Sequence, residues 1–187
     1  MITKIRLQNW KSFKDSSLYI DSLGILIGTN ASGKSNVLDA FAFLRAVAEG
    51  KNLLDAIQTV RGGEDWIIRR GENEFCLSVE IEDNGCEYVI ALRVKKEDAT
   101  FCYGLCEIHR KDAEENVVPG KFVDSVRNIT WNVYGVQASL DFLPMIYTHL
   151  RNVFILDPVP AKMRDYCKVS KELKPDGSNV AGVLCAL

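Results

Sequence analysis

Proline, histidine and long apolar runs are all scarce in this sequence of 187 residues, which has 5 Pro and 2 His. No stretch approaches the run of about 18 apolar residues that a membrane span needs. The proline and glycine contents lie far from those of collagen or of a Pro-rich linker. A net charge of −2 argues against a globally basic nucleic-acid-binding protein. We therefore expect a folded protein with no membrane partner.

The length and composition are those of a globular protein, with 47% hydrophobic and 26% charged residues. At about 100–200 residues per domain, the chain corresponds to one domain or slightly more. A chain of this size buries roughly two-thirds of its unfolded surface and needs no disulfides for stability. Because the start of the chain carries no apolar signal peptide, we expect a cytoplasmic protein whose 6 cysteines are reduced and mostly buried.

Apolar spacing in the first third of the chain predicts three strands and two helices. The loose alternation in 2–8 and the short run 17–20 each favour a strand. The continuous apolar run 23–27 is typical of a strand buried on both faces. From Asn36, apolar residues at three- to four-residue spacing predict a helix that ends at Gly50. Residues 53–57 suggest a second, short helix.

The middle of the chain changes to a period of two, which predicts an antiparallel meander. Residues 75–81 and 88–94 alternate on either side of the turn sequence Asp-Asn-Gly at 83–85, and 101–108 supplies a third strand. One face of such a meander is packed and the other is wet. Further expected elements are a strand near 129–133, a helix over 139–151, a buried strand over 153–156 and the first turns of a helix from 178.

Residues 28–35, Gly-Thr-Asn-Ala-Ser-Gly-Lys-Ser, match G-x-x-x-x-G-K-[ST], the phosphate-binding loop. Gly28 and Gly33 allow a tight turn whose N–H groups point at phosphate oxygens. Lys34 would bring positive charge to the β- and γ-phosphates, and the Ser35 hydroxyl would bind Mg²⁺. The predicted strand before the loop and helix after it are the context that the motif requires. The sequence therefore predicts a nucleoside triphosphate and Mg²⁺ as ligands.

Several segments around this loop resemble the ATP-binding heads of the SMC/RecF/OLD-type ATPases. These heads belong to the wider ABC-type ATPases, and the name AAA family is also used for them. Residues 5–13, IRLQNWKSF, are similar to the opening strand and turn of these heads. Residues 33–40, GKSNVLDA, are similar to their GKSN-x-x-DA pattern. Residues 67–81 resemble the start of their antiparallel subdomain. Residues 153–187 resemble bacterial OLD-like members, several of which serve in phage defence.

The resemblance implies an α/β fold with a P-loop nucleotide-binding lobe. This lobe would have a mixed sheet, with an antiparallel β-meander subdomain beside it. Residues 1–187 would form an incomplete ABC-type head. Within it we expect the P-loop core at 1–60, the β subdomain at 61–135, and a helix, a buried strand and the start of a second lobe at 136–187.

The resemblance also implies a set of residues around the triphosphate, namely Gly28, Thr29, Asn30, Ala31, Ser32, Gly33, Lys34, Ser35 and Asn36. Such heads often place groups near the base or the α-phosphate where Lys11 and Ser12 lie. For Lys11, a solvated turn lysine is an equal alternative.

Residues 154–157, Phe-Ile-Leu-Asp, imitate a Walker B strand, in which Asp157 would hold Mg²⁺ through water. The following residue is Pro158, where hydrolysis would need a glutamate to position water. The other interpretation of Asp157 is that it ends a core strand near the boundary of the lobe.

In the resembled family, two heads sandwich two ATP molecules, closing on ATP binding and opening on hydrolysis. The chain would then be the ATP/Mg²⁺-binding lobe of a head-to-head homodimer, when complete, with an output in DNA repair or phage defence. DNA and a separate nuclease are candidate partners. No LSGG-like signature segment occurs in the sequence. The alternative is therefore a truncated or non-catalytic module that binds ATP without hydrolysing it.

A third interpretation, a compact P-loop GTPase or kinase that uses Asp157, is disfavoured. The sequence contains no Asn-Lys-x-Asp element of the kind that reads a guanine base.

Overall fold

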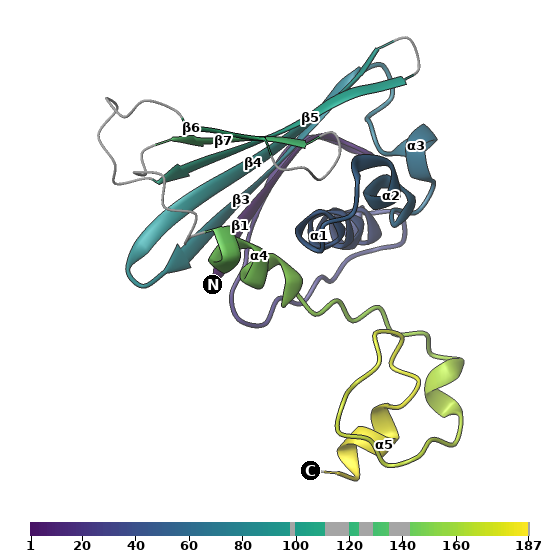
Figure 1. Cartoon of the computed structure of the whole chain (residues 1–187). Coiled ribbons are helices and arrows are strands. Elements are labelled where there is room, and N and C mark those ends of the chain that lie inside the picture. The colour runs from purple at the N-terminus through teal and green to yellow at the C-terminus, as the bar shows by residue number, and fades with distance from the viewer. Residues whose placement is uncertain (98–99, 111–119, 124–128, 135–142, 187) are drawn as a thin grey trace. The chain divides into compact units, whose positions relative to one another are not determined.

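The computed structural model describes residues 1–97, 100–110, 120–123, 129–134 and 143–186. The chain divides into two compact units, Met1–Asn152 and Val153–Leu187, which are described separately below (Figure 1). Among the described helices, none combines the length and the apolar character needed to cross a lipid bilayer.

The first unit is built on a seven-stranded sheet with the order β2-β1-β3-β4-β5-β7-β6. Its strands are β1 (Ile2–Trp10), β2 (Phe13–Tyr19), β3 (Glu74–Asp83), β4 (Cys86–Glu97), β5 (Thr100–Arg110), β6 (Gly120–Val123) and β7 (Ile129–Tyr134). Neighbouring strands are antiparallel except for β5 and β7, which are parallel. The sheet is therefore mixed, and the expected meander β3-β4-β5 is present in it.

The meander β3-β4-β5 is continuous with the first two strands of the chain in the seven-stranded sheet. Strand β1 pairs directly with β3, with Ile5 opposite Val79 and Leu7 opposite Leu77. All four of these side chains are buried, so they belong to one apolar face. Because both strands must bury this face against the same helices, they share a single sheet.

The turn between β3 and β4 confirms the hairpin predicted from Asp-Asn-Gly. Asn84 and Gly85 have φ angles of 51° and 78°. Positive φ at both central residues is the requirement of the two-residue turn that matches the twist of paired strands. The turn therefore fixes the register of β3 against β4.

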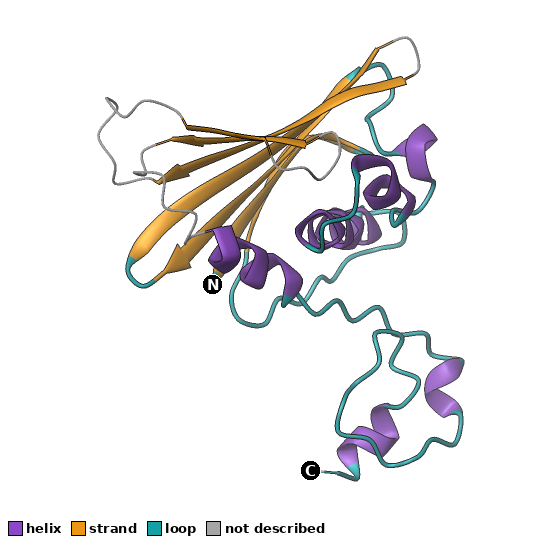
Figure 2. Cartoon of the chain, in the orientation of Figure 1, coloured by secondary structure: helices purple, strands orange, loops and turns teal. Residues whose placement is uncertain are grey.

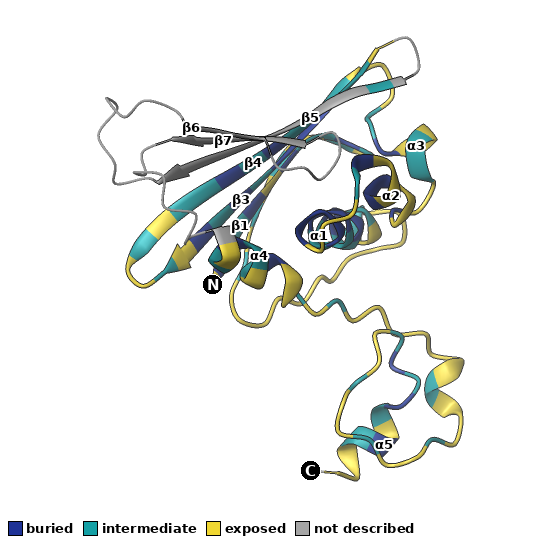
Figure 3. Cartoon of the chain, in the orientation of Figure 1, coloured by how far each residue is buried: buried dark blue, intermediate teal, exposed yellow. Residues whose placement is uncertain are grey.

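Helices α1 (Lys34–Ala48), α2 (Leu53–Gln58), α3 (Gly63–Trp66) and α4 (Leu143–Arg151) complete the first unit. Figure 2 shows α1 and α2 on one side of the sheet, and Figure 3 shows the buried side of α1. The helices predicted from residue 36 and over 53–57 are confirmed. The expected helix over 139–151 is present from residue 143, and 139–142 lie outside the described residues.

Three aromatic rings join the sheet to α1 in the core. The centroid of the Trp10 ring lies 5.7 Å from that of Phe43 and 5.0 Å from that of Phe75. The centroids of the Phe43 and Phe75 rings are 5.6 Å apart. All three side chains are fully buried. The two contacts made by Phe75 are edge-to-face, and contacts of this kind add to the stabilisation that burial gives. The end of β1 and the start of β3 are therefore both anchored against α1.

The strand predicted over 23–27 is wrong. This segment has no regular secondary structure, and Leu23, Ile25 and Ile27 are 76%, 73% and 91% exposed. Its apolar composition favours a buried strand, but a strand also needs a neighbour for its backbone N–H and C=O groups. Sheet pairing in the described part of the first unit uses the seven named strands.

The second unit contains η2 (Lys162–Arg164) and α5 (Val180–Leu184), the latter confirming the helical turns expected from residue 178. The buried side chain of Asn179 holds the preceding loop: it accepts from the N–H of Lys174 and donates to the carbonyl of Glu172, both at 2.8 Å. The strand predicted over 153–156 is wrong, since this segment is irregular and Phe154 and Leu156 are exposed.

A pH-dependent contact is expected in this second unit at Asp176. Hydrogen bonds from the N–H and hydroxyl of Ser178, and then from Lys162, lower the pKa of its carboxyl from 3.8 to about 2. Because the folded pKa is depressed, this stabilisation is fully present above pH 3.8 and disappears as the pH falls through about 2.

We expect a carboxyl titration followed by NMR to give the lowered midpoint, and Asp176→Asn to remove this part of the acid dependence of unfolding. Titration at the ordinary value of 3.8 would contradict the expectation.

Candidate phosphate-binding site

The predicted phosphate-binding loop closes around the amine of Lys34. Its Nζ donates to the carbonyls of Gly28 at 2.7 Å and Thr29 at 2.6 Å, and lies 3.3 Å from the Ser32 Oγ. The lysine therefore curls back over the loop that precedes it. This arrangement places the positive charge of Lys34 at the centre of the loop and at the N-terminal end of α1.

Of the two motif glycines, Gly33 occupies a position where a side chain would be strained, whereas Gly28 closely approaches only the rotatable hydroxyl of Ser32. Gly33 has a φ of 95°, and a Cβ there would lie 2.8 Å from the Phe13 ring. A Cβ at Gly28 would lie 2.8 Å from the Ser32 Oγ. The loop thus depends on glycine at residue 33, where the backbone has a positive φ.

The N-terminus of α1 is open at the same place. Gly33 is the N-cap residue and provides no side-chain cap, and the first turn of the helix contains no acidic residue. Uncapped N–H groups and the positive end of the helix dipole together favour an anion. The residues present therefore fit a phosphate group, with the Ser35 hydroxyl in the same turn as a candidate oxygen ligand for Mg²⁺.

The end of β1 and the turn that follows it form hydrogen bonds with Asn36, in the first turn of α1. The indole Nε1 of Trp10 donates to the Asn36 carbonyl at 2.7 Å. The Asn36 side chain in turn donates from Nδ2 to the Ser12 hydroxyl at 2.8 Å. The structure thus brings Ser12 and Asn36, both predicted site residues, into direct contact.

Lys11, the other residue predicted at the nucleotide, has a different contact. Its Nζ lies 2.5 Å from the Asp39 Oδ2, and the two side chains are only 8% and 6% exposed. Lys11 also donates to the Arg61 carbonyl at 2.6 Å. The amine is therefore part of a buried ion pair and is not a solvated turn lysine.

The sequence reasoning did not identify Asp39 and Arg61 as site residues. Arg61 Nε donates to Asp39 Oδ1 at 2.9 Å, and its Nη2 donates to the Ser35 carbonyl at 2.9 Å. We call Lys11, Asp39 and Arg61 the Asp39 cluster. A carboxylate among the apolar positions of α1 was the available signal, because a buried charge requires partners.

Two further predicted site residues, Asn30 and Ala31, are exposed at the tip of the loop, where Ala31 has a φ of 64°.

Asp157, the predicted Walker B carboxylate, belongs to the second unit, where its N–H donates to the Pro175 carbonyl at 2.9 Å. Among the described residues, no group of three or more His, Cys, Asp or Glu is arranged to hold a metal ion.

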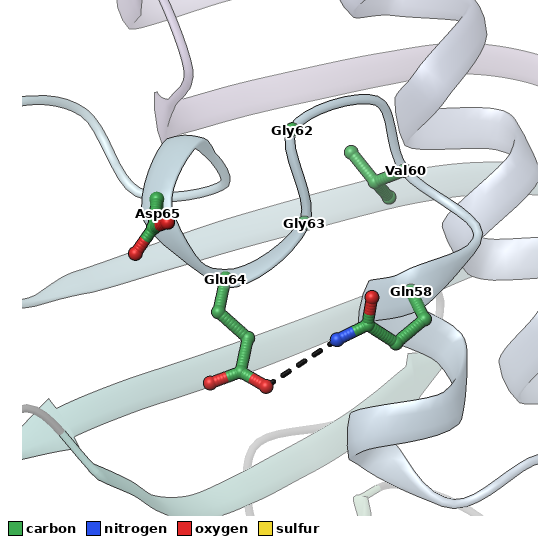
Figure 4. Close-up of a pocket in the computed structure, with 6 residues that line it drawn as sticks. All are labelled: Gln58, Val60, Gly62, Gly63, Glu64 and Asp65. Carbon is green, nitrogen blue, oxygen red and sulfur yellow. Dashed lines mark hydrogen bonds between the residues drawn. The ribbon is translucent and has the colours of Figure 1, made fainter.

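A polar hollow elsewhere in the first unit is shown in Figure 4. It is lined by Gln58, Val60, Gly62, Gly63, Glu64 and Asp65. Gln58 Nε2 donates across it to Glu64 Oε1 at 3.4 Å. None of these residues belongs to the phosphate-binding loop, and two of them, Glu64 and Asp65, are carboxylates. The hollow is therefore not suited to a triphosphate.

Comparison with known families gives a match over most of the chain. A family model described as "AAA ATPase domain" matches residues 1–133. This stretch includes the phosphate-binding loop, α1 and all seven strands of the sheet except the last residue of β7.

Three relatives illustrate the similarity. The DNA double-strand break repair Rad50 ATPase of Sulfolobus acidocaldarius is 30% identical over 48% of this chain and 9% of its own length. The chromosome partition protein Smc of Methanocaldococcus jannaschii is 28% identical over 68% of this chain and 12% of its own. The DNA replication and repair protein RecF of Agathobacter rectalis is 25% identical over 58% of this chain and 31% of its own.

The chain thus spans less than a third of the length of each of these three relatives. The similarity confirms the resemblance to SMC- and RecF-type proteins over the N-terminal part of the chain.

Proposed function

The chain belongs to the AAA ATPase domain family, and from this premise we propose that it binds ATP with Mg²⁺ at residues 28–36. The observation that carries the proposal is the position of Lys34, whose amine lies within the loop on the carbonyls of Gly28 and Thr29. An ammonium group held at an uncapped helix N-terminus is suited to the β- and γ-phosphates.

Each residue of the site has a distinct role in this proposal. The backbone N–H groups of 29–34 would bind phosphate oxygens, Lys34 would neutralise their charge, and the Ser35 hydroxyl would bind Mg²⁺. Asn36 and Ser12 would hold the loop by their mutual hydrogen bond. When bound, Mg²⁺ neutralises phosphate charge during transfer of the γ-phosphoryl group.

We further propose that the chain acts as a nucleotide-binding lobe of a larger ATPase that works in DNA repair or chromosome maintenance. The names of the Rad50, Smc and RecF relatives support this output. As in the resembled heads, two copies of the complete protein would close on ATP, because a triphosphate bridging two surfaces favours the closed state. DNA would then contact the closed pair. A phage-defence output and a partner nuclease remain hypotheses from the resemblance of 153–187 to OLD-like proteins.

A second candidate function is a module that binds ATP without hydrolysing it. Pro158 after Asp157 favours this alternative, because hydrolysis would need a glutamate at that position to orient the attacking water. Asp157 as a Mg²⁺ ligand, and Lys11 in contact with the nucleotide, are further proposals that binding data on variants would address.

Calorimetric titration of the purified chain with ATP, GTP and adenosine, each with and without MgCl₂, tests the proposed function. We expect ATP to bind more tightly with Mg²⁺ and adenosine to bind far more weakly, since the site is built for phosphates. Phosphate release measured on the same sample separates an ATPase from a binding module. If neither ATP nor GTP binds in the presence of MgCl₂, the proposal is wrong.

A further inference from the structure

The Asp39 cluster lies beside the phosphate-binding loop but is made by three separate segments of the chain. Lys11 comes from the turn between β1 and β2, Asp39 from the second turn of α1, and Arg61 from the loop between α2 and α3. Asp39 receives both cations, through Oδ2 from Lys11 and through Oδ1 from Arg61. Two cations against one carboxylate give the cluster a net charge of about +1 at neutral pH.

Arg61 connects this cluster to the first turn of α1. One guanidinium nitrogen binds the Asp39 carboxylate and another binds the Ser35 carbonyl, each at 2.9 Å. Ser35 and Asp39 are four residues apart, so Arg61 spans one complete helical turn. It therefore holds both ends of the turn from which the Ser35 hydroxyl projects.

We propose that Arg61 is a positioning residue for the Mg²⁺-binding hydroxyl of Ser35, and that Asp39 orients Arg61 for this role. The inference rests on the proposed function. Its physical basis is the planar guanidinium, which forms two directed hydrogen bonds in fixed relative positions.

Loss of Arg61 is expected to weaken mainly the binding of Mg²⁺, and the binding of ATP itself to a smaller extent. Partners that orient a metal ligand are worth about 10- to 100-fold in metal affinity. Arg61→Ala should therefore raise the MgCl₂ concentration for half-maximal ATP binding by about 10- to 100-fold, with a smaller change in ATP affinity in EDTA. Because the Arg61 side chain is 52% exposed, the variant is expected to fold.

The experiment is equilibrium dialysis of radiolabelled ATP against the full chain, with MgCl₂ varied and an EDTA arm. Arg69→Ala is the matched control, because Arg69 is also a partly exposed arginine and its side chain pairs with Glu72, which is not a member of the cluster. Arg69→Ala should keep the Mg²⁺ dependence of the wild type. Thermal unfolding of each variant records any loss of fold.

Arg61→Lys provides a second test, independent of the stability of the alanine variant. A lysine keeps the charge but has a single ammonium in place of the planar fork, so we expect an intermediate rise in the Mg²⁺ requirement. The inference is overturned if both Arg61 variants keep the wild-type Mg²⁺ dependence, or if they weaken ATP equally in EDTA and in MgCl₂. Failure of the wild type itself to bind ATP would instead overturn the proposed function.

Discussion

Replacing Lys34 by alanine should remove most of the affinity for ATP while leaving the fold intact. The amine is the one charged side chain that the loop itself holds at its centre, on the carbonyls of Gly28 and Thr29. A hydrogen bond to a charged group contributes about 1.5–3 kcal/mol, which corresponds to roughly 10- to 150-fold in the dissociation constant. Calorimetric titration with ATP and MgCl₂ measures this loss directly.

Lys51→Ala is the matched control for Lys34→Ala. Lys51 is a half-exposed lysine just beyond α1 that pairs loosely with Glu49, and it has no role in the loop. Both variants lose one positive charge, so an effect of net charge alone would appear in both. An ATP affinity within twofold of the wild type for Lys34→Ala would contradict the assignment of this loop as the phosphate site.

Replacing Asp39 by alanine should strongly destabilise the first unit. The substitution leaves the Lys11 side chain, which is only 8% exposed, without the carboxylate oxygen that lies 2.5 Å from its Nζ. Removing one partner of a buried ion pair costs about 3–5 kcal/mol, because the remaining charge is not compensated. Urea unfolding followed by the fluorescence of Trp10 and the other tryptophans measures the loss.

Two comparisons identify the cause of that destabilisation. Asp15→Ala removes a carboxylate that pairs with Arg6 on the exposed side of the sheet, where ion pairs contribute little, so its effect should be much smaller. The double variant Lys11→Met/Asp39→Leu removes both buried charges and should recover much of the stability lost in Asp39→Ala. If Asp39→Ala and Asp15→Ala lowered the free energy of unfolding equally, the buried pair would stabilise the first unit no more than an exposed pair does.

The sequence predicts those parts of the structure whose cause is local. The spacing of glycines, lysine and serine in 28–35 implies a tight loop before a helix, and the structure has the loop and a helix from Lys34. The Asn84-Gly85 turn is also local, since positive φ at two adjacent positions determines it. In these places the residues that decide the conformation are adjacent in sequence.

The errors concern partners that are distant in sequence. The segment 23–27 has the composition of a buried strand, but composition does not supply the neighbouring strand that its backbone needs. For Lys11, the alternative of a solvated turn lysine is wrong, because its amine pairs with Asp39, which lies 28 residues further along the chain. Arg61 is 22 residues beyond Asp39, so no local pattern connects it to the site.

The pairing of β1 with β3 also has a consequence for how the first unit folds. Ile2 lies opposite Ile81, so this pair closes a loop that contains β2, the phosphate-binding loop and helices α1, α2 and α3. Contacts between residues so far apart carry a large loop-closure entropy, and domains rich in them fold slowly. We expect the hairpin of β3 and β4, whose contacts are local, to form first, and the phosphate-binding loop to be ordered only once β1 has joined it.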